Sequence, residues 1–105
     1  MDTLARLEQT IAARLEASPE KSYVASLSAR GLSVIARKLG EEATEAVVAA
    51  LAGDEVDVVG EAADVLFHLL VLLGEKGIAL ERVLGELERR EGTSGHAEKA
   101  ARTSR

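Results

Sequence analysis

The 105-residue sequence contains no cysteine, a single proline and only two aromatic residues, Tyr23 and Phe67. The absence of cysteine excludes disulfides and thiolate metal sites, and it agrees with a reducing compartment such as the cytoplasm. With so few aromatics the core must consist of Leu, Val, Ile and Ala, which favours helices over a β-sandwich. No apolar run approaches the roughly 20 residues of a membrane span, and the charged, amphipathic start is unlike a secretory signal. We therefore expect one cytoplasmic, helical domain without a membrane partner.

Basic residues are missing from the centre of the chain. Residues 39–75 contain nine acids and no Lys or Arg, although the whole sequence has thirteen basic residues. The net charge of −5 and the scarcity of aromatic stacking platforms argue against general binding of nucleic acid. An acidic centre between basic flanks could instead hold a cation and, on that cation, a polyanion.

Apolar spacing, interrupted by Pro19 and by glycines, predicts an all-α bundle of about five helices. The expected helices cover approximately residues 3–17, 23–30, 34–52, 55–76 and 80–91. Ser22 and Ser33 are the expected N-caps of the second and third helices. Residues 1–92 would form the helical domain, and residues 93–105 are small, polar and basic, which is typical of a flexible tail.

Two acidic stretches lie on consecutive predicted helices, KLGEEATEA at 38–46 and EAADVLFHLL at 61–70. At about 100° per residue, Glu42 borders the apolar face of the first of these helices, and Glu45 lies one turn further along. On the second helix, one stripe about 60° wide carries all of the polar candidates: Asp57, Glu61, Asp64 and His68. Apolar residues cover most of the remaining circumference, so this helix needs partners on several sides, which favours a homo-oligomer.

Burying ionised carboxylates costs several kcal/mol each unless a cation compensates them. The helix that carries Glu61 and Asp64 supplies no basic residue to pair with them. Hard oxygen ligands suit Mg²⁺ or, as a substitute, Mn²⁺. The predicted metal ligands are Glu42, Glu45, Glu61 and Asp64. The alternative is that each acidic pair belongs to an ordinary solvated helix face, but two such pairs on consecutive helices favour the metal site.

His68 has two interpretations. It lies one turn beyond Asp64 and could bind metal or substrate, or it could be a histidine at the edge of the core, bonded to a carboxylate. A di-iron carboxylate centre would require Glu-x-x-His on two helices. That pattern is absent, because the residues three positions after the glutamates are Glu45 and Asp64.

The ExxE and ExxD pairs, formed by Glu42 with Glu45 and Glu61 with Asp64, resemble those of the MazG-like all-α nucleotide pyrophosphohydrolases. The segments SYVASL at 22–27 and SG-x-x-EKA-x-R within 88–102 narrow the resemblance to the phosphoribosyl-ATP pyrophosphohydrolase family of histidine biosynthesis. The resemblance implies Mg²⁺-dependent hydrolysis of phosphoribosyl-ATP to phosphoribosyl-AMP and pyrophosphate. It also implies a cytoplasmic homo-oligomer.

Several further residues gain candidate roles from this resemblance. Glu41 could be a general base or an outer support of the four acidic ligands, or merely a solvated glutamate. Lys38 could bind a phosphate oxygen or be a surface charge. Lys99 and Arg102 of the tail could close over the polyphosphate. Two other functions stay open, a house-cleaning MazG-type hydrolase of nucleoside triphosphates and a non-catalytic helical interaction module.

Overall fold

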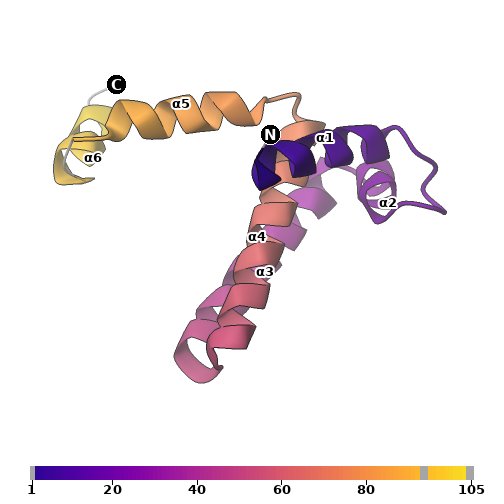
Figure 1. Ribbon diagram of the computed structural model, residues 1–105, viewed down its shortest axis with the longest axis horizontal. Helices are drawn as coiled ribbons and strands as arrows, with labels where there is room; N and C mark the ends of the chain where they lie inside the picture. The colour runs from indigo at the N-terminus through magenta and orange to yellow at the C-terminus, as the bar shows by residue number, and fades with distance from the viewer. Residues whose placement is uncertain (1, 93–94, 104–105) are drawn as a thin grey trace.

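The computed structural model describes residues 2–92 and 95–103, and within these ranges all regular structure is helical. The helices are α1 (Thr3–Leu15), α2 (Tyr23–Arg30), α3 (Leu32–Ala52), α4 (Glu55–Glu75), α5 (Leu80–Arg90) and α6 (Gly95–Thr103). The predicted all-α class is therefore confirmed. Figure 1 shows a long hairpin of α3 and α4, with α1 and α2 packed at one end of it.

The five expected helices are present, with the first one ending at Leu15 and thus two residues earlier than expected. A sixth helix, α6, occupies Gly95–Thr103 within the segment expected to be a flexible tail. Residues 93, 94, 104 and 105 of that segment lie outside the described residues. The division into a domain at 1–92 and a flexible tail stays a prediction.

The junction between α2 and α3 consists of Gly31 alone. This glycine has φ +105°, a region that side chains with a Cβ rarely adopt, so it can end one helix and begin the next within one residue. As expected, the Ser22 hydroxyl caps α2 by accepting from the amide of Ala25 at 3.1 Å. The predicted cap at Ser33 is wrong, because α3 already begins at Leu32 and has no side-chain cap.

The turn between α3 and α4 is tight and closes the acidic hairpin. Asp54 and Asp57 form a reciprocal capping box at the start of α4. A Cβ at Gly53 would lie 2.7 Å from the Asp57 Oδ2 atom and 3.0 Å from the carbonyl oxygen of Ala49. A side chain at position 53 would therefore displace Asp57 from its capping box, and the close turn sets the two acidic helices antiparallel.

The core lies where α1, α2 and α3 cover the C-terminal half of α4. Its buried members are Ile11, Val24, Leu27, Ile35, Leu70, Val71, Leu73 and Leu80. Polar bonds tie the helices together around it. The Ser28 hydroxyl donates to Glu75 at 2.6 Å, and Glu8 accepts the amide of Leu80 at 2.7 Å, which anchors the start of α5.

Away from this core, the distal half of the hairpin has no covering helix, and α5 with α6 runs outward from the bundle (Figure 1). Apolar side chains are exposed there, at Val47, Val48, Leu51, Val56 and Val59 of the hairpin and at Leu84 and Leu87 of α5. The apolar helix α4 is thus buried by this chain along only half of its length. Among the described helices, none combines the length and the apolar character that crossing a membrane requires.

Candidate active site

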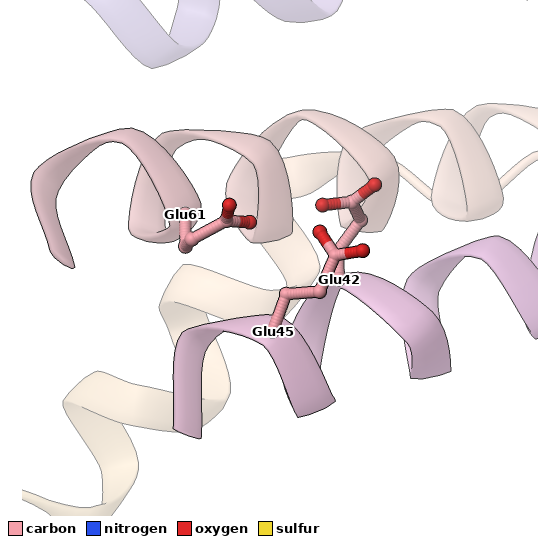
Figure 2. A group of neighbouring side chains, drawn as sticks. All are labelled: Glu42, Glu45 and Glu61. Carbon is pink, nitrogen blue, oxygen red and sulfur yellow. The ribbon is translucent and has the colours of Figure 1, made fainter. Parts of the chain in front are cut away.

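Three glutamates meet between the two helices of the hairpin. Glu42 and Glu45 come from successive turns of α3, and Glu61 comes from the facing turn of α4. Each offers one carboxylate oxygen, and these oxygens all lie within 4.8 Å of one another. Figure 2 shows the three side chains directed toward one another across the gap between the helices. We refer to Glu42, Glu45 and Glu61 as the acidic triad.

The electrostatics of the acidic triad are unfavourable without a cation. The Oε2 atoms of Glu42 and Glu61 are buried and, in the described part of the chain, have no hydrogen-bond partner. Burial raises the pKa of Glu61 above its usual range, and the nearby negative charges of Glu45, Glu42 and Asp64 raise this pKa further. Buried, unpaired acceptors that repel one another are stabilised by a positive ion between them. The donor set, which consists entirely of hard oxygens, fits a divalent ion of the Mg²⁺ type.

Asp64, the fourth predicted ligand, is not brought into the acidic triad. It lies one turn beyond Glu61 on α4, is exposed, and acts on Glu61 through its charge. Its main-chain carbonyl accepts a hydrogen bond from the ring of His68. A role for its carboxylate as a ligand stays a prediction.

Glu41 and Lys38 form a separate charged group beside the acidic triad. The Glu41 carboxylate lies 3.3 Å from the Lys38 ammonium and 3.5 Å from the Arg37 guanidinium. The hydrogen bond to Glu41 is the main cause that raises the pKa of Lys38, and the negative charge of Glu42 adds a smaller contribution. Glu41 adjoins the predicted ligands in sequence, but in the structure its carboxylate pairs with Arg37 and Lys38.

His68 is buried and uses both ring nitrogens. Its Nδ1 atom lies 2.8 Å from the carbonyl oxygen of Asp64, and its Nε2 atom lies 3.0 Å from the Tyr23 hydroxyl oxygen. A carbonyl can only accept, so Nδ1 carries a proton and donates to it, while Nε2 shares a hydrogen bond with the Tyr23 hydroxyl. The histidine thus links α2 to α4, with a carbonyl and a phenol rather than a carboxylate as partners. The sequence did not predict that Tyr23 bonds to His68. The segment at 22–27 that contains it contributed only to the family resemblance.

Lys99 and Arg102, the predicted cations of the tail, are exposed on α6. Figure 1 places α6 at the outer end of α5, which runs away from the α3–α4 hairpin. Within one chain the structure therefore does not bring these two residues to the acidic triad. Their contact with substrate stays a prediction.

Comparison with models of known protein families identifies the family of this chain. The model described as phosphoribosyl-ATP pyrophosphohydrolase matches residues 4–91, which include every helix that forms the acidic triad and the core. The chain belongs to this family. The resemblance inferred from the ExxE and ExxD pairs and the flanking segments is thereby confirmed.

Individual relatives agree over nearly the full length. The chain is 61% identical to the phosphoribosyl-ATP pyrophosphatase of Erythrobacter litoralis over 102 residues, which is 97% of this chain and 98% of that protein. It is 65% identical to the phosphoribosyl-ATP pyrophosphatase of Rhizorhabdus wittichii over 100 residues, or 95% and 94% of the two chains. Identity to the protein of the same name from Cereibacter sphaeroides is 53% over 102 residues. The chain is therefore an enzyme of this family, and the alternative of a non-catalytic interaction module is set aside.

Proposed function

We propose that the protein hydrolyses phosphoribosyl-ATP at its α–β phosphoanhydride bond and releases pyrophosphate and phosphoribosyl-AMP, with Mg²⁺ as the cofactor and Mn²⁺ as a substitute. This is a step of histidine biosynthesis, and the names of the relatives support it. The observation that carries the metal dependence is the acidic triad, with two buried oxygens that lack partners among the described residues.

The acidic triad would hold the ion between α3 and α4, with Asp64 as a further ligand from the exposed side. When bound, the ion supplies positive charge for the polyphosphate oxygens and lowers the pKa of a coordinated water. Without it, the charges of Glu42, Glu45 and Glu61 would repel the substrate. In this proposal the two turns of α3 and the facing turn of α4 would position the polyphosphate, and positioning supplies much of the catalysis in phosphoryl transfer.

Two charged residues next to the acidic triad complete the proposed chemistry. Lys38 is firmly protonated, because its bond to Glu41 raises its pKa, and it lies one turn before Glu42, where a phosphate oxygen would be within reach. Glu41 is the candidate acceptor for the proton of the attacking water, or the residue that holds Lys38 in place. These two roles differ in their consequence, since only the first makes the rate depend on the basicity of Glu41.

We also propose that the enzyme is a homo-oligomer, most simply a dimer. The distal hairpin and α5 both extend away from the core, and among the described residues no other helix covers their exposed apolar side chains. Exposed groups of apolar side chains of this kind mark protein interfaces. A cytoplasmic location and the absence of a nucleic-acid partner remain predictions from composition.

The test is incubation of the purified protein with phosphoribosyl-ATP and Mg²⁺ in ¹⁸O-labelled water, followed by phosphorus NMR. We expect pyrophosphate and phosphoribosyl-AMP, and the label identifies which phosphorus is attacked. The protein without divalent ions should be inactive, and Mn²⁺ should restore turnover. Faster hydrolysis of ordinary nucleoside triphosphates than of phosphoribosyl-ATP would favour a house-cleaning hydrolase instead, and no pyrophosphate release from either would refute the proposal.

A further inference from the structure

A pocket of about 380 Å³ lies between the end of α1, the loop that follows it and the start of α2. Its lining consists of Arg14, Ala17, Lys21, Ser22, Tyr23, Val24 and Phe67. The only two aromatic side chains in the sequence thus meet two cations in one concave site. The size is typical of a pocket for a small ligand, and the lining combines an apolar floor with charge.

Among the described residues, the two cations of this pocket have no acidic partner. Neither Arg14 nor Lys21 forms an ion pair in the described parts of the chain, 2–92 and 95–103. Other cations behave differently, since Arg37 and Lys38 share Glu41. An arginine and a lysine that line one pocket suit a phosphate group, because a guanidinium can donate two parallel hydrogen bonds and an ammonium adds a point charge.

The aromatic part of the pocket is held in place. The Tyr23 ring stacks on Phe67 with centroids 6.4 Å apart and planes at 20°, and the Tyr23 hydroxyl is bonded to His68. Although it is anchored in this way, Tyr23 remains 50% exposed. A fixed and accessible aromatic ring offers a flat apolar surface to the carbon face of a sugar or to a base.

Tyr23 of the pocket lies close enough to Lys38 for an electrostatic interaction, and Lys38 lies one turn before Glu42 of the acidic triad. His68, which holds Tyr23, comes seven residues after Glu61, which is nearly two full turns and about 10 Å along the helix axis. One elongated ligand could therefore reach both places. Phosphoribosyl-ATP has the matching chemistry, since its triphosphate lies at one end and the phosphorylated ribose attached to the adenine lies at the other.

We infer that Arg14 and Lys21 bind the phosphate of the phosphoribosyl group, with the ribose against the ring of Tyr23. This inference rests on the proposed function and adds how the enzyme distinguishes its substrate from ATP. The acidic triad and its ion take the triphosphate, which both molecules carry, whereas the pocket takes the one phosphate that ATP lacks. Arg14, Lys21 and Tyr23 then determine specificity without taking part in bond cleavage.

The decisive experiment compares the double variant Arg14→Gln, Lys21→Gln with the control Arg30→Gln, Lys76→Gln, which makes the same change in net charge outside the pocket. KM for phosphoribosyl-ATP should rise about tenfold or more in the pocket variant, because charge-assisted bonds to the phosphate are lost, while kcat changes little. The inhibition constant of ATP should be the same in both variants and in the wild type. An unchanged KM for phosphoribosyl-ATP, or an equal loss of ATP affinity, would overturn the inference.

A second measurement separates this inference from the proposed function. Ribose 5-phosphate added to ¹⁵N-labelled protein should shift the amide signals of Ser22 and Val24 in the wild type and in the control, but not in the pocket variant. If phosphoribosyl-ATP is not a substrate, the proposed function fails, and these shifts still report on the pocket. Shifts that are absent from the wild type, or that survive in the pocket variant, would refute phosphate binding there. The single variant Lys21→Gln, in the exposed loop, provides the same comparison if the double variant fails to fold.

Discussion

Both halves of α4 carry large apolar side chains, but the surroundings of these side chains are very different. In the C-terminal half, Leu70 and Val71 are buried under α1, α2 and α3. In the N-terminal half, Val56 is 78% exposed and Val59 is 69% exposed, because only α3 lies beside them. The apolar character of Val56 and Val59 alone would predict that they are buried as well. The difference arises from topology, since α1 and α2 are too short to reach beyond one end of the hairpin.

Because of this asymmetry, the residues that stabilise the fold and the residues of the proposed metal site lie in different halves of the hairpin. The closed half of the hairpin holds the core, and the acidic triad lies toward the open half, where a polyphosphate has access from solvent. Carboxylates that repel one another weaken the fold wherever they are placed. Placing them beyond the core confines that effect to a region that a second copy of the chain and a bound ion would stabilise.

The largest expected effect concerns Glu61 at the boundary of the open half. Glu61→Gln keeps the shape of the side chain and removes its charge, so turnover of phosphoribosyl-ATP should fall by a factor on the order of 1,000. The helical circular dichroism should be unchanged. Glu55→Gln, an exposed substitution on the same helix, is the control and should retain activity. Near-wild-type turnover of the Glu61 variant at saturating Mg²⁺ would refute the metal site.

The stability of the metal-free protein should depend on pH through Glu61, and the same variant tests this. The pKa of Glu61 is higher in the folded than in the unfolded state, so the folded state binds its proton more tightly. Stability from this group is therefore greatest below the unfolded pKa of about 4.3, and it decreases as the pH rises through the folded pKa. Thermal melts between acid and neutral pH should show this decrease in the wild type and a smaller one in Glu61→Gln. An identical profile for the two proteins would contradict the repulsion within the acidic triad.

In the closed half, Ile35 is fully buried against the core. Ile35→Ala should lower the free energy of unfolding by about 2–5 kcal/mol, because it removes buried methyl groups and leaves a cavity. Ile35→Val, the graded control, should lower it by about 0.5–1.5 kcal/mol. Urea unfolding measures both. Equal losses of unfolding free energy in the two variants would show that the closed half is loosely packed. The closed half would then not be the more tightly packed of the two.

In the open half, Val59→Glu should weaken self-association rather than folding of the single chain. A new charge within an apolar interface must be desolvated on assembly, so the dissociation constant should rise about tenfold or more. Sedimentation velocity over a range of concentrations measures this change. Gln9→Glu adds the same charge on α1 and should have little effect. A wild-type protein that sediments as a monomer at micromolar concentration would refute the proposed oligomer.

The sequence predicted most of the fold because the signals are local. Apolar residues at helical spacing gave five helices, and Ser22 caps α2 as its type suggests. The acidic triad was also predictable, since Glu42 and Glu45 are one turn apart and the short turn at Gly53 brings the next helix alongside. Ser33 failed as a cap because Gly31 allows α3 to begin one residue before it.

The remaining features depend on the relative placement of helices that are distant in sequence. The rotation of α4 against α3 directs Glu61, and not Asp64, toward Glu42 and Glu45. Tyr23 and His68 are 45 residues apart, and nothing local indicates that they form a hydrogen bond. The pocket at Arg14 and Lys21 exists only because α1, α2 and α4 meet there.

The smallest expected effect tests this last contact, which joins α2 to α4 where the closed half begins. Tyr23→Phe keeps the ring on Phe67 and removes the hydroxyl, so the buried Nε2 atom of His68 loses its partner at 3.0 Å. The free energy of unfolding should decrease by about 1 kcal/mol. His68→Leu removes the other partner, and the double variant should cost less than the sum of the two single variants, since both remove the same bond. Strictly additive losses would show that the hydrogen bond contributes nothing, and that α2 is held at this point by the packing of the aromatic rings alone.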